Sequence, residues 1–231
     1  MVNKTNLKNI WLEKYDAALK NTKGKINNDG ILIEIAAQHP LVDGITPNTE
    51  FTKRLLLGIE IYFKYKELNQ TVKIYVPGSI HNDDKISLSE AGKNFLLKHG
   101  VKDEDIFSVE MNLKYKRNEG VYNSSDECYV ASKLFNDLNY KELHSVCSSA
   151  QLMRKALSYI EFGVYPFMHS VTCYDMFHNY VNEFFDYIPI LLEDKNGLQG
   201  DSKEGKRLRE ERKPNTTQSF KNWHKLTIKK V

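Results

Sequence analysis

The chain has 231 residues, enough for one large domain with a substantial core, and its 41% hydrophobic and 27% charged residues are typical of a globular protein. The net charge of +3 is too small to indicate a nucleic-acid-binding protein, and three cysteines without CxxC spacing argue against a disulfide framework or a zinc site and favour a reducing cytosol. No apolar run resembles a signal peptide or reaches the roughly 18 residues of a membrane span, so we expect a cytoplasmic protein that does not engage a membrane.

The first half of the chain alternates apolar runs of strand length with amphipathic helices. We expect an N-terminal helix over residues 8–20, then strands over residues 30–37, 71–77 and 105–110. A capping box from Ser87 to Glu90 begins a helix that ends at Gly100. The helix between the first two strands carries apolar residues at helical spacing, namely Phe51, Leu55, Leu56, Ile59, Tyr62 and Phe63.

The second half continues the alternation. We expect a helix over residues 124–138, a strand over 143–147, a helix over 149–162 and a strand over 165–172. A long aromatic helix over residues 174–192 follows, which would form core or a homodimer interface. After it the composition becomes charged, which is typical of an extended arm.

Strands that alternate with helices of this length predict a three-layer α/β/α sandwich around a mainly parallel, Rossmann-like sheet of five strands. Runs that are apolar on both faces fit strands buried between two helical layers. We therefore divide the chain into an N-terminal helix and linker (residues 1–29), a Rossmann-like domain (30–192) and a charged C-terminal arm (193–231).

The most informative stretch is the strand–turn–helix over residues 143–163. Two hydroxyls, Ser148 and Ser149, lie at the turn, and Arg154 follows in the first turns of the helix. Backbone N–H groups and the positive end of the dipole at a helix N-terminus favour anions. The stretch therefore predicts a site for a phosphate or a carboxylate.

Polar residues also follow the other strands, and parallel strand ends meet at one edge of the sheet. Each of them has a structural alternative. His39 and His81 could be ordinary loop histidines, and Arg54 and Arg154 could form surface ion pairs. Helix capping would explain Ser124 and Glu127, although a Ser124 cap does not need Asn123. Glu110 could cap its strand end, and Cys147 fits a small core residue.

In order and spacing, these residues resemble the YdcF/SanA/ElyC-like family, a Rossmann-like domain of unknown function, in its soluble branch. The resemblance spans residues 31–171. Its motifs are matched by Arg54, Gly78-Ser79, Ser89-Glu90-Ala91, Glu110, Asn123-Ser124-x-x-Glu127, and Val146-Cys147-Ser148 with Arg154.

Two positions depart from the family pattern. Ala36-Ala37-Gln38-His39 replaces a glycine-rich turn, and Gln151 replaces a histidine. Glutamine can hydrogen-bond but does not transfer protons near neutral pH, so a chain in which the family histidine is an acid or base would either lack that step or use His39 or His81 for it. The resemblance makes S-adenosylmethionine a candidate cofactor, although no motif by itself requires it. Strand-end carboxylates are compatible with Mg²⁺, although no spacing of metal ligands is present.

The leading hypothesis is a cytosolic enzyme that binds a phosphorylated or nucleotide-like small molecule and catalyses its hydrolysis or group transfer. Glu110, Glu127 and His39 are the candidate catalytic residues. The candidate binding residues are Arg54, Gly78, Ser79, Asn123, Ser124, Ser148, Ser149, Gln151 and Arg154. The alternatives are a non-catalytic module that binds a nucleotide or S-adenosylmethionine, and an interaction protein that uses its basic arm.

Overall fold

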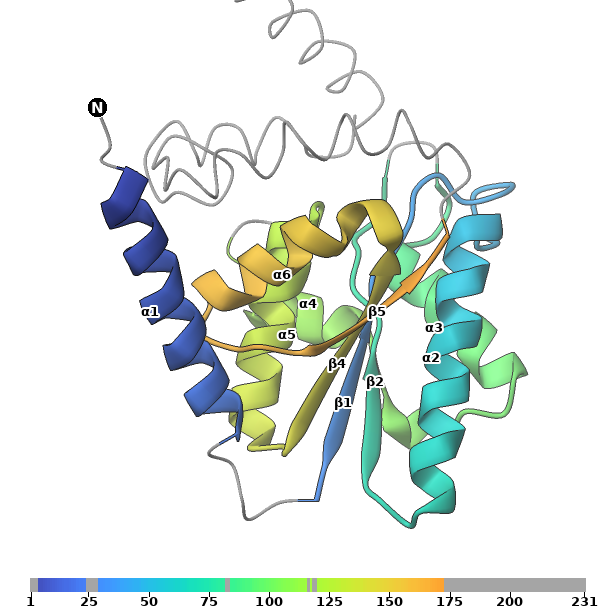
Figure 1. The fold of residues 1–231 in the computed structure, drawn as a ribbon. Helices are drawn as coiled ribbons and strands as arrows, with labels where there is room; N and C mark the ends of the chain where they lie inside the picture. Colours follow the sequence, from blue (N-terminus) through green and yellow to red (C-terminus); the bar gives the residue numbers. More distant parts are fainter. Residues whose placement is uncertain (1–3, 24–28, 82–83, 116, 118–119, 173–231) are drawn as a thin grey trace, which may run out of the picture.

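The computed structural model describes residues 4–23, 29–81, 84–115, 117 and 120–172, and the side chains from residue 9 onward. It contains a five-stranded, all-parallel sheet in the order β3-β2-β1-β4-β5, with helices on both faces (Figure 1). The predicted α/β fold class is confirmed. The strands are β1 (Ile31–Ile35), β2 (Val72–Tyr75), β3 (Ile106–Phe107), β4 (Glu142–Ser148) and β5 (Phe167–Val171).

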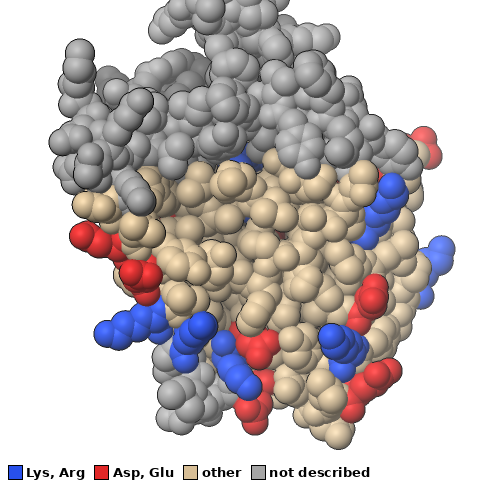
Figure 2. All heavy atoms as spheres, viewed as in Figure 1, with Lys and Arg blue, Asp and Glu red and all other residues tan. Residues whose placement is uncertain are grey.

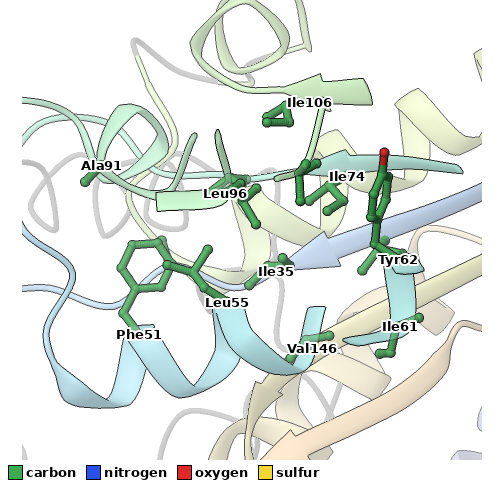
Figure 3. Packing of buried hydrophobic residues seen from close by; sticks show 14 of the residues in the cluster. Ile35, Phe51, Leu55, Ile61, Tyr62, Ile74, Ala91, Leu96, Ile106 and Val146 are labelled. Atoms are coloured by element: carbon green, nitrogen blue, oxygen red, sulfur yellow. The ribbon is translucent and has the colours of Figure 1, made fainter. Parts of the chain in front are cut away.

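Strand β1 supplies both layers of the core because its side chains alternate between the two faces of the sheet. Ile31, Ile33 and Ile35 pack against helices α2 (Thr49–Glu67) and α3 (Leu88–Lys98), as Figure 3 shows for Ile35. Leu32 belongs to the core cluster of the opposite face, under α5 (Ser124–Leu138) and α6 (Leu152–Glu161). Each face of the sheet thus has its own apolar core.

Helix α2 begins at an Asn48 cap, whose side chain accepts from the backbone N–H of Phe51 at 2.9 Å. It packs close to β1 at Gly58, where an added Cβ would lie only 2.2 Å from Ile35 Cδ1. The predicted apolar face is wrong at two positions, since Leu56 is 46% and Phe63 is 40% exposed. Both residues lie about 100° or more around the helix from the stripe that faces the sheet.

The sequence-based expectation differs from the structure by one or two residues at most strand ends and by more at three places. Strand β3 has two residues because the chain turns at Ser108 into helix α4 (Val109–Tyr115). A 3₁₀ turn (Ser149–Gln151) precedes α6. The N-terminal helix α1 (Lys4–Lys23) is longer than predicted and lies beside α6, where Lys14 pairs with Glu161 at 2.6 Å (Figure 1). The predicted helix over residues 174–192, the arm and Cys173 lie outside the described residues.

Within the residues described, no helix combines the length and apolar composition that crossing a membrane requires. Figure 2 shows one face of the molecule, where Lys and Arg alternate with Asp and Glu below the region that is drawn in grey. The described part of this face therefore carries charges of both signs, in keeping with the small net charge of +3.

Candidate functional site at the β1–β4 switch point

The strand order reverses at β1, whose neighbours are β2 on one side and β4 on the other. Ile35 lies opposite Val146, and the N–H of Ala36 donates to the carbonyl of Val146 at 2.9 Å. The ends of β1 and β4 are therefore adjacent. In open α/β sheets, ligands bind at the carboxyl edge where the order reverses, which makes this the candidate site.

Arg54 is fully buried and ties the end of β1 to the end of β4. Its guanidinium donates to the carbonyls of Ala36 and Ala37, at 3.1 and 2.9 Å. It also bonds Glu50 at 2.5 Å, Gln38 Oε1 at 2.8 Å and the hydroxyl of Ser148; Glu50 accepts from that hydroxyl as well. Arg54 Nε has no hydrogen-bond partner among the described residues but is fully buried, so the predicted ligand contact of Arg54 stays a prediction.

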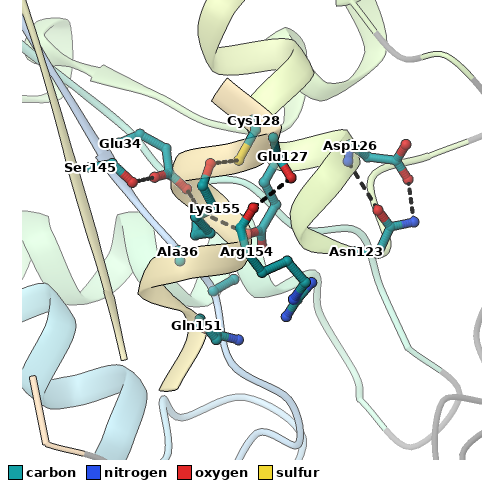
Figure 4. Close-up of polar contacts among 12 residues, drawn as sticks. Glu34, Ala36, Asn123, Asp126, Glu127, Cys128, Ser145, Gln151, Arg154 and Lys155 are labelled. Atoms are coloured by element: carbon teal, nitrogen blue, oxygen red, sulfur yellow. Dashed lines mark hydrogen bonds and ion pairs between the residues drawn. The ribbon is translucent and has the colours of Figure 1, made fainter. Parts of the chain in front are cut away.

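The remaining anion-site residues follow β4. Ser148 and Gln151 lie together, with the Ser148 hydroxyl 3.4 Å from Gln151 Oε1. Ser149 is half-buried in the 3₁₀ turn, and Arg154 is buried in the first turn of α6. Figure 4 shows the Arg154 side chain leaving α6 away from Glu34. The structure thus gathers the predicted residues after β4 around one helix N-terminus.

His39 and Asp84 form a hydrogen-bonded pair beside the end of β1. His39 Nδ1 lies 3.1 Å from Asp84 Oδ2, and the other carboxylate oxygen accepts from the N–H of Leu41 at 3.1 Å. The His39 side chain is 16% exposed, and its Nε2 has no hydrogen-bond partner among the described residues. With Asp84 accepting from Nδ1–H, Nε2 carries the lone pair and can act as a general base.

His81 packs on the face of His39, with ring centroids 4.4 Å apart, and Tyr122 packs edge-on against His81. Burial, together with the proximity of His39, lowers the pKa of His81 to about 4. His81 is therefore neutral at pH 7. Its ring packs against the His39 ring and restricts the orientation of that ring beside Asp84.

A charged cluster lies between β1, α5 and α6 (Figure 4). Lys155 Nζ contacts Glu34 Oε1 at 2.6 Å and Glu127 Oε2 at 3.1 Å. Glu34 Oε2 accepts from Ser145 at 2.6 Å and from Tyr159 at 3.1 Å. Burial raises the pKa of Glu34 despite the nearby Lys155. Burial alone would lower the pKa of Lys155, but Glu34 and Glu127 raise it above its usual value, so Lys155 is charged.

The N-terminus of α5 corrects the capping prediction. The cap is Asn123, whose Oδ1 accepts from the N–H of Asp126 at 3.0 Å and whose Nδ2 donates to Asp126 Oδ2 at 2.9 Å. Capping by Ser124 and Glu127 is therefore wrong, and the view that the cap does not need Asn123 is wrong too. Glu127 is free of the capping role and binds Lys155 instead.

Other predicted site residues support the backbone around the site. Gly78 has a φ of +106°, which favours glycine, and Ser79 Oγ accepts from the N–H of Val121 at 2.9 Å. Glu110 is exposed in the first turn of α4, where it accepts from the N–H and hydroxyl of Ser108. Those are its only hydrogen bonds to described residues, so its catalytic role stays a prediction. Ser124 is buried at the start of α5.

The sequence reasoning missed Glu34, Lys155, Asp84 and Glu50. A signal for Glu34 was present, since it is the one charged residue in Ile31–Ile35. Lys155 and Tyr159 are spaced one helical turn apart on the same buried face of α6, which is a weaker signal. Asp84 reaches His39 across 45 positions, and no local pattern marks it. Glu50 lies one turn before Arg54 in α2, and this i,i+4 spacing was a local signal for the pair.

Metal and thiol chemistry find little support in the described residues. These contain no group of three His, Cys, Asp or Glu side chains arranged to hold a metal ion, so Mg²⁺ binding stays a prediction. Burial raises the pKa of the Cys128 thiol, which disfavours a reactive thiolate. Cys147 is fully buried, as expected for a core residue.

Comparison of the chain with known proteins found no matching family model, no matching curated protein and no matching solved structure. The resemblance to the YdcF/SanA/ElyC-like family therefore rests on the sequence motifs alone and stays a prediction.

Proposed function

We propose that this protein is a cytosolic enzyme that binds a phosphorylated or nucleotide-like small molecule at the β1–β4 switch point and catalyses its hydrolysis or group transfer. The observation that carries the proposal is the His39–Asp84 pair, which lies at the end of β1 with Nε2 unpartnered among the described residues. A carboxylate that orients a histidine in this way is a common arrangement for a general base.

In this proposal, His39 Nε2 takes a proton from a water or a hydroxyl nucleophile as the nucleophile attacks the ligand. The anionic part of the ligand lies near Ser148, Ser149 and Arg154, where the helix dipole and the backbone N–H groups of α6 favour negative charge. The proton moves to His39 while the bond to the leaving group breaks. Asp84 stabilises the imidazolium that forms.

A second candidate is a binding module without catalysis, for a nucleotide or S-adenosylmethionine. The observation that favours it is Gln151, which lies beside Ser148 where the predicted family pattern has a histidine. Arg54 and Lys155 are also neutralised by Glu50, Glu34 and Glu127, which leaves less free positive charge for an anion. A partner-binding role of the arm, and a homodimer formed through residues 174–192, stay predictions.

The test uses the full chain and its His39→Gln variant. Native mass spectrometry identifies a co-purifying ligand, and a thermal-shift screen of nucleotides, sugar phosphates and S-adenosylmethionine extends the search. We expect a ligand to raise the melting temperature of both proteins, and product formation to drop roughly a hundredfold or more in His39→Gln, as loss of a general base does.

His99→Gln is the matched control, because His99 is exposed at the C-terminus of α3, beyond the opposite edge of the sheet. It should keep both binding and turnover. Turnover by His39→Gln at the wild-type rate would eliminate His39 as the base. Ligand binding without turnover by the wild-type chain would favour the binding module.

A further inference from the structure

A carboxylate oxygen of Glu127 has no hydrogen-bond partner among the described residues. Glu127 is 7% exposed, and its Oε2 is held by Lys155 at 3.1 Å. Its Oε1 accepts no hydrogen bond from any described residue, and it is not among the fully buried atoms without a partner. Oε1 therefore reaches the surface of the described structure through the small exposed part of the side chain.

Glu127 lies in the ionic cluster in which Lys155 joins α5 to Glu34 on β1. Its charge is near enough to His81 to favour the protonated form of that ring, and His81 stacks on His39. A nearly buried carboxylate oxygen without a donor is costly unless a donor is supplied. Asn123 and Asp126 satisfy the start of α5 without Glu127, so the helix offers no reason for this placement.

We infer that Glu127 accepts a hydrogen bond through Oε1 from a hydroxyl group of the sugar in a nucleotide-like ligand, and that Lys155 positions the carboxylate for this contact. The inference rests on the proposed function and adds to it a ligand class, a ribose-bearing phosphate. The charges in the cluster favour a neutral donor. Lys155 already faces Glu127, and a ligand ammonium on Oε1 would lie close to that lysine and be repelled by it.

Lys155 acts here through Glu127 and does not touch the ligand itself. Its ammonium also contacts Glu34, which is fixed by Ser145 and Tyr159. The lysine therefore has a rigid anchor on β1 and presents Glu127 in one orientation.

The test measures the affinity of the full chain for 5′-mononucleotides, for their 2′,3′-dideoxy counterparts and for inorganic phosphate by calorimetry. We expect the ribonucleotide to bind roughly ten- to a hundredfold more tightly than its dideoxy counterpart, the usual effect of one hydrogen bond to a charged group. Glu127→Gln should lower the affinity for the ribonucleotide by a similar factor. It should also reduce the ratio of this affinity to the affinity for the dideoxynucleotide. Glu60→Gln, at an exposed position on α2, is the control and should change neither value.

The outcomes separate this inference from the proposed function. If ribonucleotides and dideoxynucleotides bind the wild-type chain equally, or phosphate binds as tightly as either, Glu127 does not bind the sugar, although the anion site stands. If none of the probes binds, both the inference and the proposed function fail. The comparison of ribose with dideoxyribose needs no variant, so equal affinities would overturn the inference even if Glu127→Gln does not fold.

Discussion

The two faces of the sheet are built differently, although β1 contributes to both. Under α2 and α3, Ile33 and Ile35 pack among other aliphatic and aromatic side chains (Figure 3). Under α5 and α6, Leu32 packs in a second apolar cluster, but its neighbour Glu34 is buried in a network with Lys155. The centre of one face is an apolar cluster, and the centre of the other holds the Glu34–Lys155 ion pair.

This difference indicates that the α5/α6 face contributes less to stability than an apolar core of the same size would. Buried ion pairs are often no more stabilising than apolar side chains of the same shape, because both charges lose their hydration. The α2/α3 face stabilises the sheet mainly by apolar burial, with Arg54 paired to Glu50 at its end. The α5/α6 face keeps its charges where they hold Glu127 near the ends of β1 and β4, which fits a role in the site better than a role in stability.

Removal of Lys155 from the α5/α6 face should give the largest loss in the free energy of unfolding. In Lys155→Met, Glu34 and Glu127 would remain buried without their cation. We expect the free energy of unfolding to fall by about 3–5 kcal/mol, the usual cost of breaking a buried pair from one side. Urea denaturation at pH 7 measures it.

Two controls accompany this prediction. Lys133→Met, at an exposed position on α5, should change the unfolding free energy by less than about 0.5 kcal/mol. The double variant Lys155→Met/Glu34→Gln should recover part of the loss, because one of the stranded carboxylates becomes neutral. A loss of less than about 1 kcal/mol in unfolding free energy for Lys155→Met would contradict this prediction. It would mean that water hydrates the charged cluster in solution.

The α2/α3 face also holds a buried histidine, which should make the protein sensitive to acid. His144 packs against Tyr65 of α2, and its ring nitrogens face Glu142 and His169 at 3.2 and 2.9 Å. Burial lowers the pKa of His144 from 6.5 to about 4, with His169 and Lys64 acting in the same direction and Glu142 opposing them.

The folded pKa lies below the unfolded one, so the stabilising contribution is complete above about pH 6.5 and is lost as the pH falls toward 4. We expect His144 to account for a loss of about 2 kcal/mol in unfolding free energy between pH 7 and pH 5. His144→Phe should reduce the slope measured by urea denaturation, although His81, with a pKa also near 4, should retain part of it. An unchanged slope in His144→Phe would contradict the assignment, whereas His99→Gln should leave the slope as it is.

Elements whose pattern is local could be predicted from the sequence. The apolar runs located β1 and β2, and the predicted helix over residues 124–138 coincides with α5. Parallel topology followed from the alternation of strands and helices. The general position of the site followed as well, because the strand ends of a parallel sheet share one edge.

Most contacts within the site could not be predicted, since they join residues far apart in the chain. The His39–Asp84 pair spans 45 positions, and the Glu34–Lys155 pair spans 121. Strand β3 was overestimated because the step from strand to helix at Ser108 depends on its bonds to Glu110. The cap of α5 was misplaced by one residue, since Asn123 and Ser124 are both good capping residues and sequence alone does not choose between them.

The smallest expected effect concerns Asn123, which caps α5. Asn123→Ala removes the side chain that accepts from the N–H of Asp126, so we expect a loss of about 1 kcal/mol in unfolding free energy by urea denaturation. Asn123→Asp keeps an acceptor and should retain most of that stability. Ligand affinity should be unchanged in both variants, because the Asn123 side chain is occupied by Asp126. If Asn123→Ala weakened nucleotide binding as much as Glu127→Gln, Asn123 would contact the ligand, and the cap would be a consequence of the site rather than a separate feature of α5.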